Sequence, residues 1–497
     1  MKKIFLSFIF LFFASTLFAV DYYVSATGSN SNNGLSIGAA WQTLSKVQSV
    51  CNAGTIHAGD RILFKCGDTF SGSISIDNTR GHSAVDGTAL QPVTWSYYGT
   101  GAKPIFLCNN ASSNPEDRHL LEFIGMDYWI IDGIHFTDTD HSNDHIVPGI
   151  CGFPIYLGSY NSGPSNPEKC NHWLIQYCDF DYVDMGVVII GDSNTVTHCS
   201  MTNFKNLKST PWNGIADDPT SYEDYGANPF TIIWANGNVF TYNYISGGWA
   251  ESMDFGYNGG TCETIGSCSN NKIMYNTIVD CNGLSEYGQG GTSSNNIYAY
   301  NKLVNNGAMF WVNSDCQVVN SQFYNNVIVE NNNSRFALGS SNAGAGVSSS
   351  EALSHLNLDA YMFDSQGSSQ TATTVFNNKN NIIQISNPLK IARTAQGKMN
   401  HDYNIVKLSG GSSYGYSLSA HETSTSGAIW VNTSDSDPSN WDFHLLTSHL
   451  GVDVSLTLDF DNKTVPTSPN TTPNIGAYEF ILPSSCVGCY TTWHHIK

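Results

Sequence analysis

The residues best suited to chemistry are two carboxylates, Asp254 and Glu286. Asp254 follows Asn243 by eleven residues, Glu286 follows Asn276 by ten, and both asparagines belong to a recurring segment. We therefore expect the two acids at equivalent positions of neighbouring repeats. Carboxyl groups roughly 5 Å apart suit a retaining glycosidase, in which one is the nucleophile and the other the acid/base. Repulsion between such groups raises the pKa of one of them, as the acid role requires.

Further candidates surround this pair. Counting on from Asn301 reaches Trp311, and counting on from Asn325 reaches Arg335. An outward tryptophan gives a flat apolar platform on which a sugar ring can stack. Trp249 and Glu251 either line a cleft or simply begin the strand of Asp254, and the acids near position 217 are either reserve catalysts or solubilising loop residues. The residues assigned to substrate binding are Trp311, Arg335, Trp249, Glu251, Trp212, Asp217, Asp218 and Tyr287.

An internal repeat must position these residues. A Tyr-Asn pair followed two residues later by Ile, Leu or Val begins at Tyr242, Tyr275, Tyr300, Tyr324 and Tyr403. Two earlier units carry Cys178 and Cys199 in the place of the asparagine. The spacing is 21 residues between these cysteines, 25 from Asn276 to Asn301 and 24 from Asn301 to Asn325. Longer gaps between units are explained by inserted loops.

A unit of this length, with short alternating strands and Asn or Gly at its bends, predicts one rung of a right-handed parallel β-helix. Propeller blades need about 40 residues or more, and sandwiches do not repeat at this period. Stacked rungs lie about 4.8 Å apart, so asparagines can form a hydrogen-bonded ladder. Cys178 above Cys199 would be a stacked thiol pair or a strained disulfide. Inward Met253 and Phe255 would turn Asp254 outward.

Three long insertions interrupt the repeat, at residues 205–229, 256–271 and 339–373. Insertions at corresponding positions of nearby rungs could wall a cleft over the two acids, because function commonly sits in loops on a rigid scaffold. A disulfide between Cys262 and Cys268 is expected to close a small loop in the second insertion. The pair Cys486 and Cys489 is expected to be a terminal staple or two free thiols rather than a zinc or redox site.

Both ends of the chain carry recognisable motifs. One runs from Asp21-Tyr22-Tyr23-Val24-Ser25 through GSNSNNG at 28–34 to Trp41-Gln42-Thr43-Leu44, and the other is PNIGAYE at 473–479. They resemble the opening and closing motifs of bacterial secreted right-handed β-helix proteins of the pectate-lyase-like superfamily. The resemblance implies a carbohydrate-active protein and supplies no catalytic residue by itself. The best-marked lyase and polygalacturonase signatures of that superfamily are absent from the sequence.

Composition narrows the class of partner. Charged residues make up only 12% of the 497 residues, and the formal net charge is −20. Such a chain has no basic patch with which to neutralise phosphates, so nucleic-acid binding is excluded. The partner expected is a polysaccharide or oligosaccharide, and the protein is expected to be a monomer. No cofactor is expected to be required, although a column of carboxylates is compatible with Ca2+.

The N-terminus predicts export. Met1-Lys2-Lys3 is followed by the apolar run Ile4 to Ala19, which is typical of a signal peptide at residues 1–19 and too short for a membrane span. The expected location is secreted, either extracellular or periplasmic. Residues 20–480 are interpreted as one β-helix domain, with an N-terminal cap and first rungs at 20–120, central rungs at 121–409 and C-terminal rungs and cap at 410–480. Residues 481–497 are a tail, and a helix within 41–50 is expected to plug the N-terminal end.

These features favour a hydrolase of neutral or weakly charged plant or algal glycans. The first alternative is a polysaccharide lyase, which needs a base and a cation to neutralise a uronate carboxylate. Its candidates are Lys272, Lys302, Arg335, His198 and Tyr287, and the negative net charge opposes an anionic substrate unless Ca2+ or a basic groove intervenes. The second alternative is a non-catalytic glycan-binding or adhesion protein, although adhesins usually have longer and more uniform repeats.

Overall fold

Short strands recur along the chain, and many of them bury only their middle residue. In Thr195–Thr197, Val196 is buried and both threonines are half-buried, which is the alternation of a strand with one face on a core. A computed structural model describes residues 19–79, 81–108, 119–138, 153–159, 167–183, 185–204, 228–247, 251–255, 268–281, 283–287, 292–306, 308–312, 317–330, 361–365, 375–386, 390–392, 399–410, 412, 414, 417–433, 440–446, 451–452, 454, 458–464 and 474–478.

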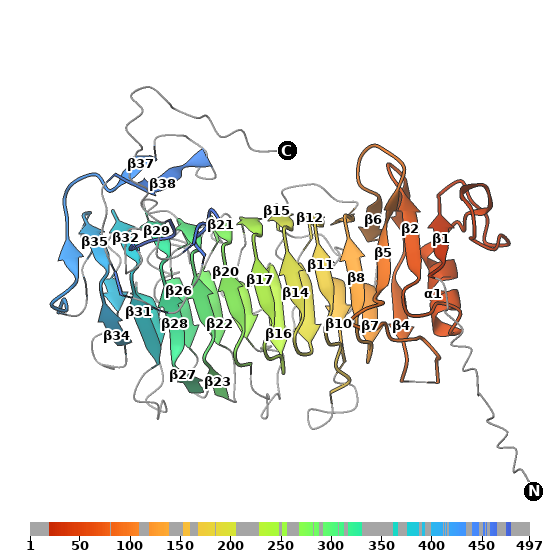
Figure 1. Ribbon diagram of the computed structural model, residues 1–497, viewed down its shortest axis with the longest axis horizontal. Helices are drawn as coiled ribbons and strands as arrows, with labels where there is room; N and C mark the ends of the chain where they lie inside the picture. The colour runs from red at the N-terminus through yellow and green to blue at the C-terminus, as the bar shows by residue number, and fades with distance from the viewer. Residues whose placement is uncertain are drawn as a thin grey trace, which may run out of the picture.

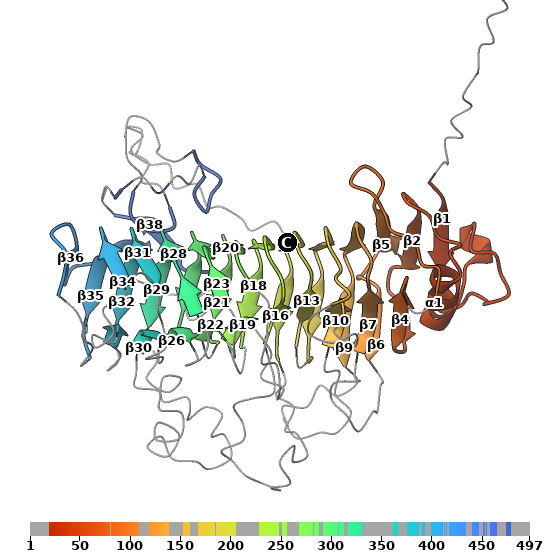
Figure 2. The ribbon, with the colours of Figure 1, turned by 90° about the horizontal axis from the view of Figure 1, so that it is seen from below.

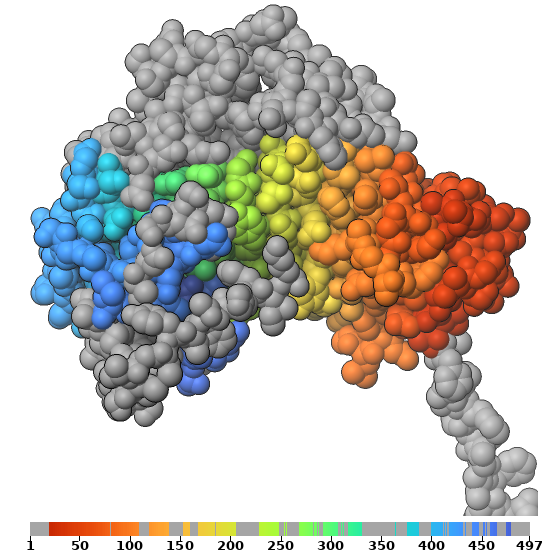
Figure 3. All heavy atoms as spheres, turned by 90° about the horizontal axis from the view of Figure 1, so that it is seen from above, coloured from red at the N-terminus to blue at the C-terminus, as the bar shows by residue number. Residues whose placement is uncertain are grey.

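The strands wind into a right-handed parallel β-helix, which confirms the predicted fold (Figure 1). In the described part of the chain, successive coils contribute strands to three long parallel sheets, here called A, B and C in the order in which a coil visits them. Figure 3 shows the rungs following one another from the red N-terminal end to the blue C-terminal end. Equivalent residues of neighbouring rungs are therefore strand neighbours, about 4.8 Å apart.

Sheet A has 12 described strands. They are β1 (Asp21–Val24), β2 (Arg61–Lys65), β5 (Val93–Tyr98), β8 (Trp129–Asp132), β11 (Leu174–Gln176), β14 (Thr195–Thr197), β17 (Val239–Thr241), β20 (Lys272–Met274), β24 (Ile297–Ala299), β28 (Ser321–Tyr324), β31 (Phe376–Lys379) and β34 (Met399–Asp402).

Sheet B also has 12 described strands. They are β3 (Thr69–Ser71), β6 (Ile105–Cys108), β9 (His135–Asp138), β12 (Asp179–Asp181), β15 (Ser200–Thr202), β18 (Tyr244–Ser246), β21 (Thr277–Val279), β25 (Lys302–Val304), β29 (Val327–Glu330), β32 (Ile382–Ile385), β35 (Ile405–Leu408) and β36 (Thr423–Ser424).

Sheet C has 10 described strands, and the longest insertions of the sequence adjoin its strands along the chain. They are β4 (Ile74–Asp77), β7 (His119–Ile124), β10 (Phe153–Leu157), β13 (Val187–Ile190), β16 (Phe230–Ile233), β19 (Glu251–Phe255), β22 (Gly283–Tyr287), β26 (Ala308–Val312), β30 (Tyr361–Ser365) and β33 (Lys390–Ala392). Two short pairs, β23 (Thr292–Ser294) with β27 (Gln317–Val319) and β37 (Trp430–Asn432) with β38 (Asp442–Leu445), complete the described strands.

Apolar side chains fill the interior along its whole length. Aromatic residues of successive rungs lie against one another, with ring centroids 5.7 Å apart for Trp129 and Trp173 and 5.0 Å for Phe136 and Phe180. Trp95 belongs to the same fully buried cluster. Continuous burial of rings from rung to rung is the main apolar contribution to the stability of the stack.

A ladder of buried asparagines runs along the turn between sheets A and B. The backbone N–H of Asn243 donates to Asn276 Oδ1, that of Asn276 to Asn301 Oδ1, and that of Asn301 to Asn326 Oδ1, at 3.0, 3.0 and 2.9 Å. The predicted ladder is confirmed, but its fourth member is Asn326 and not Asn325. The spacing from Asn301 is therefore 25 residues, equal to the preceding one.

The residue before each ladder asparagine adopts the left-handed conformation, with φ of 57° at Tyr242, 60° at Tyr275 and 55° at Tyr300. This region is unfavourable for residues with a Cβ. The three rings stack, with centroids 5.0 Å and 5.5 Å apart, and His198 continues the stack at 5.1 Å from Tyr242. Stacking compensates for the backbone strain, which explains why Tyr-Asn recurs at this turn.

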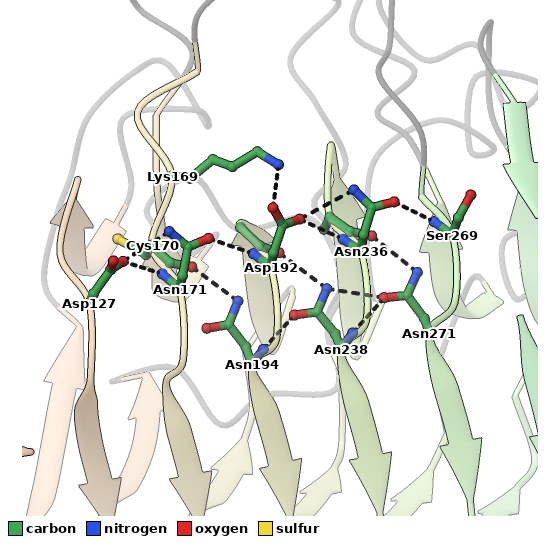
Figure 4. Close-up of polar contacts among 12 residues, drawn as sticks. Asp127, Lys169, Cys170, Asn171, Asp192, Asn194, Asn236, Asn238, Ser269 and Asn271 are labelled. Carbon is green, nitrogen blue, oxygen red and sulfur yellow. Dashed lines mark hydrogen bonds and ion pairs between the residues drawn. The ribbon is translucent and has the colours of Figure 1, made fainter. Parts of the chain in front are cut away.

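Figure 4 shows a second pair of ladders, on the turn that precedes the strands of sheet A. In the inner row, the backbone N–H of Asn194 donates to Asn238 Oδ1 and that of Asn238 to Asn271 Oδ1, at 2.8 and 2.9 Å. In the outer row, Asp192 accepts the N–H of Asn236 and pairs with Lys169, both at 2.8 Å. Side-chain amides thus satisfy the buried backbone groups at the corner of each rung.

The N-terminal end carries a helix near the predicted position, at residues 44–52 rather than within 41–50. Helix α1 (Leu44–Asn52) begins at Thr43, whose side chain accepts the N–H of Lys46, and it buries Leu44 and Val47 among other residues. Its apolar face joins the main core and contacts β4. A short 3-10 helix, Ile37–Ala39, precedes it. No helix in the described part of the chain is both long and apolar enough to cross a membrane.

The C-terminal segment corrects one expectation. Strand β36 does lie at the end of sheet B, but the later strands β37 and β38 lie along the side of the stack and do not cap its end (Figures 1 and 2). Trp430 and Phe443 of the β37–β38 pair, with Tyr478, form one buried cluster with residues of sheet B such as Val304 and Ile382. The closing motif takes part, since Asn474 O accepts Asn325 Nδ2 and Gly476 N donates to Asn380 O, at 2.9 and 2.7 Å.

The cysteines of the described residues are thiols. Cys178 and Cys199 are buried free thiols, so the stacked thiol pair is confirmed and the strained disulfide is wrong. Burial, together with Cys178, raises the pKa of Cys199. Cys268 is a buried thiol whose Sγ donates to Ile232 O at 3.5 Å, so the disulfide predicted between it and Cys262 is wrong. Cys262, Cys486 and Cys489 lie outside the described residues, and the state of Cys486 and Cys489 stays a prediction.

Candidate functional site

The outer face of sheet C holds the two predicted acids. In β19, Met253 and Phe255 are buried in the core, so the intervening Asp254 occupies an outer position of the strand. In β22, Ser285 and Tyr287 are fully buried, which likewise gives Glu286 an outer position. Alternation within each strand therefore places both acids on the same face of the sheet.

Strand register brings these positions together. Asp254 is the partner of Glu286, and Glu286 is the partner of Trp311 in β26. This is the order expected from counting along the repeat. Adjacent strands hold their backbones about 4.8 Å apart, and a retaining glycosidase needs its two carboxyl groups at a similar separation. The catalytic and binding roles of the three residues stay predictions.

The next position of this column is Asp364 of β30, which is the register partner of Trp311. The expectation that Arg335 follows Trp311 is therefore wrong, and Arg335 itself lies outside the described residues. The long insertion before β30 displaced the count. Asp364 is a third acid in this column, and the sequence did not reveal it. The insertion before β30 has no repeat motif, so counting along the sequence cannot tell which later residue takes the next position in the column. In the other direction, the column continues from Asp254 to Thr231.

Several other candidates cannot be placed. Trp249, Trp212, Asp217 and Asp218 lie outside the described residues, so their assignment to a cleft stays a prediction. Glu251 is the first residue of β19 and the register partner of Gly283. Glu251 occupies the same side of the strand as Met253 and Phe255, whose side chains are buried. This favours the interpretation that Glu251 begins the strand over the interpretation that it lines a cleft.

Tyr287 is not a surface residue, and its assignment to substrate binding is wrong. Its ring is fully buried and stacks on Phe255, with centroids 4.7 Å apart. Its hydroxyl lies within hydrogen-bond distance of Tyr298 Oη at 3.0 Å and of Ser321 Oγ at 3.2 Å. The same alternation that places Glu286 outside requires Tyr287 to point inward.

The other candidate bases of a lyase are distributed over other faces of the helix. Lys272 begins β20 in sheet A and is exposed. Lys302 begins β25 in sheet B, and His198 lies on the turn between these two sheets, between the rings of Tyr177 and Tyr242. None of these three described residues shares sheet C with the acidic column.

Lys302 belongs instead to the contact between sheet B and the C-terminal segment. Its Nζ lies 4.3 Å from the centroid of Phe460. Burial lowers the pKa of Lys302 to about 8, against the attraction of Asp461 and Asp442. Nearby, His444 Nδ1 and Nε2 lie 2.6 and 3.0 Å from carboxylate oxygens of Asp442 and Asp461. Burial lowers the pKa of His444, but these two carboxylates outweigh it and raise the pKa to about 9.

The N-terminal half of the outer face of sheet C is differently built. In register with the acidic column lie Glu122, Tyr156, Val188 and Thr231. Tyr156 and Val188 belong to a buried apolar cluster outside the main core, and Thr231 is buried as well. Glu122 remains half-buried, with its Oε1 3.9 Å from His119 Nδ1. The buried residues Tyr156, Val188 and Thr231 thus separate Glu122 from the acids that begin at Asp254. The described residues contain no group of three or more His, Cys, Asp or Glu side chains placed to hold a metal ion.

Comparison with known proteins supports the fold. No protein-family model and no curated protein matches the sequence. Among solved structures, pectate lyase Pel9A is similar with a TM-score of 0.53 and 15% identity, over 93% of this chain and 96% of that one. XylC in complex with xylose gives a TM-score of 0.46 and 9% identity, over 93% and 98%. The alginate lyase from Paenibacillus sp. str. FPU-7 gives 0.37 and 14%, over 77% and 97%. The similarity to pectate lyase Pel9A supports the parallel β-helix fold that the end motifs indicated.

Proposed function

We propose that the protein is a secreted carbohydrate-active enzyme and, more specifically, a glycoside hydrolase of plant or algal glycans. The observation that carries the proposal is the register of Asp254 beside Glu286 on the outer face of sheet C. Trp311 on the next strand would stack on a sugar ring beside the reacting bond. The fold shared with pectate lyase Pel9A is compatible with this class and does not choose the reaction.

In the proposed mechanism, one carboxylate attacks the anomeric carbon while the other, protonated, donates its proton to the glycosidic oxygen. The leaving sugar departs, and a glycosyl ester remains on the nucleophile. The second carboxylate then removes a proton from water, which hydrolyses the ester and restores both groups. The strand spacing supports a retaining outcome, because an inverting pair needs a wider separation for the water.

The test is a glycan screen that follows new reducing ends and unsaturated-uronate absorbance together, with Ca2+ and with EDTA. We expect reducing ends without unsaturation, and loss of turnover by at least about a hundredfold in Asp254→Asn and Glu286→Gln. The acid/base variant should keep activity on glycosides with good leaving groups, which assigns the two roles. Glu122→Gln is the matched control, because Glu122 lies in the same column four rungs away, and it should keep full activity.

A polysaccharide lyase is the second candidate, favoured by Asp364 as a third carboxylate in the column. Acids of this face could contribute to a Ca2+ site completed by the substrate, whose uronate carboxylate the cation would neutralise. The positions of Lys272, Lys302 and His198 away from sheet C weigh against it. Unsaturated product that disappears with EDTA would replace the hydrolase by this alternative. Glycan binding without any product, retained in both acid variants, would instead identify a binding or adhesion protein.

A further inference from the structure

Asp60 is a buried carboxylate at the start of β2. Its side chain is only 3% exposed. Oδ1 accepts the backbone N–H of Val20 and Oδ2 accepts that of His57, both at 2.8 Å. The His57 ring, which is largely exposed, comes no closer than 3.7 Å to Oδ2. Burying a carboxylate is costly unless a cation pairs with it.

Val20 is the residue that follows the predicted cleavage site of the signal peptide. In the structure, Ala19 is exposed, whereas Val20 is half-buried and packs against the main core. The carbonyl of Val20 accepts the N–H of Arg61 at 2.9 Å, which begins the pairing of β1 with β2. The backbone nitrogen of Val20 is therefore both the atom that cleavage of the signal peptide would release and the donor to the buried Asp60.

We propose that hydrolysis of the Ala19–Val20 peptide bond creates an α-ammonium group on Val20 that forms a buried ion pair with Asp60. Water adds to the peptide bond, its oxygen remains on the Ala19 carboxyl group, and the Val20 nitrogen leaves as an amine that takes up a proton. The uncleaved chain offers Asp60 one neutral N–H at this nitrogen. The processed chain offers an ammonium with three donors and a full charge, which strengthens the contact. Removal of the signal peptide during export would thus add a buried ion pair to the N-terminal end of the stack.

No group described around Asp60 already neutralises its charge in the way that the Val20 ammonium would. Arg61 extends to Asp21, with Nε and Nη2 at 2.7 and 2.6 Å from its carboxylate oxygens. Tyr22 lies close enough that burial, and then the charge of Asp60, raises the pKa of its phenol. A phenol that stays protonated brings no positive charge to the site. Apart from Arg61, which is engaged by Asp21, the described group near Asp60 that can supply a positive charge is His57, and its side chain is 54% exposed.

The first measurement is the intact mass of protein exported with its own signal peptide. We expect a chain that begins at Val20. The reaction of its α-amino group with an amine reagent is then followed against pH. An exposed α-amino group titrates near about pH 8. Pairing with Asp60 should move this midpoint up by about one unit or more, which is about tenfold slower labelling at neutral pH.

Two comparisons separate the ion pair from a general effect on folding. Asp60→Asn should return the labelling midpoint to the ordinary range, whereas Asp21→Asn, which removes a neighbouring surface carboxylate, should not. A chain that begins one residue earlier, at Ala19, keeps every side chain but has an ordinary amide at Val20. It should label as an exposed amine and unfold at a lower temperature than the chain beginning at Val20.

Three results would overturn the proposal. They are a processed N-terminus at another residue, a labelling midpoint that is ordinary in the wild-type chain, and equal unfolding temperatures of the chains beginning at Val20 and Ala19. Failure of Asp60→Asn to fold leaves the last two measurements intact. The proposal is independent of the proposed function, since none of these measurements requires a substrate.

Discussion

Replacing Asn276 with alanine should destabilise the β-helix more than any surface substitution. Asn276 is buried in the ladder between sheets A and B. Its Oδ1 accepts the backbone N–H and the side-chain Nδ2 of Asn243, at 3.0 and 3.1 Å. Its Nδ2 donates to Phe240 O and Asn301 Oδ1, at 2.9 and 3.1 Å. The alanine variant therefore removes four hydrogen bonds, although Asn243 Nδ2 keeps Val196 O as an acceptor and Asn301 Oδ1 keeps the backbone N–H of residue 276 as a donor.

A buried polar group left without its partner costs about 1–3 kcal/mol. The two groups that lose this partner without another side-chain bond, Asn243 N–H and Phe240 O, set a range of about 2–6 kcal/mol, and we expect a loss of about 3–5 kcal/mol. The assay is denaturant unfolding followed by circular dichroism. Asn400→Ala is the control, because Asn400 is exposed in β34 and donates one side-chain bond, to Asn377 Oδ1 at 3.0 Å. A loss in Asn276→Ala no larger than in this control would refute the view that the ladder stabilises the stack.

The remaining predictions concern the C-terminal contact and the substrate platform. Because the pKa of His444 is about 9 in the folded protein, above its ordinary 6.5, its stabilisation is complete below pH 6.5 and is lost as the pH rises toward 9. The pKa of Lys302, lowered from 10.5 to about 8, opposes folding fully below pH 8, and this cost is relieved between pH 8 and 10.5. Stability should therefore fall between pH 6.5 and 8, change little between pH 8 and 9, and rise above pH 9. The fall should be about 1 kcal/mol after screening at a ring 41% exposed, and it should disappear from pH-dependent unfolding curves of His444→Gln. Gly476→Ala should lower the melting temperature, because Gly476 has φ of 96° and a Cβ there would lie 2.6 Å from Ile382 Cδ1. Trp311→Ala should raise KM about tenfold or more with a smaller change in kcat, and an unchanged KM would remove Trp311 from the binding surface.

The sequence was sufficient to predict the fold because the rungs repeat a residue pair with two distinct roles. Tyrosine takes the strained turn position and asparagine takes the ladder, so the pair recurs where the rungs at Tyr242, Tyr275, Tyr300 and Tyr403 turn from sheet A to sheet B. The register slipped at Asn325 because the doublet Asn325-Asn326 offers two asparagines. There, Asn325 adopts the turn conformation that Tyr300 adopts one rung earlier, and Asn326 takes the ladder.

Contacts between residues far apart in the sequence could not be predicted from the repeat. Asn325 bonds to Asn474, 149 residues later, and no periodic pattern links the two. The C-terminal segment packs along sheet B because Val304, Val327 and Ile382 are apolar at positions where the outer face of a solvated sheet would be polar. Tyr287, by contrast, could have been placed in the core from the sequence, since an outward Glu286 fixes the parity of its neighbour.

The construction of the acidic column leads to a last prediction, that the length of the acid side chain matters as much as its charge. Met253 and Phe255 anchor β19 in the core, and Ser285 and Tyr287 anchor β22. The separation of the Asp254 and Glu286 backbones is thus set by strand pairing, and only side-chain length adjusts the reach of each carboxyl group. Glu286→Asp withdraws that carboxyl by one methylene, and a misplacement of about 1 Å can cost about a hundredfold in rate. In steady-state kinetics, kcat should fall strongly while KM changes little, because the charge of the site is preserved. Full activity in Glu286→Asp, with none in Glu286→Gln, would show that the carboxyl group acts at a distance through its charge and does not contact the reacting sugar.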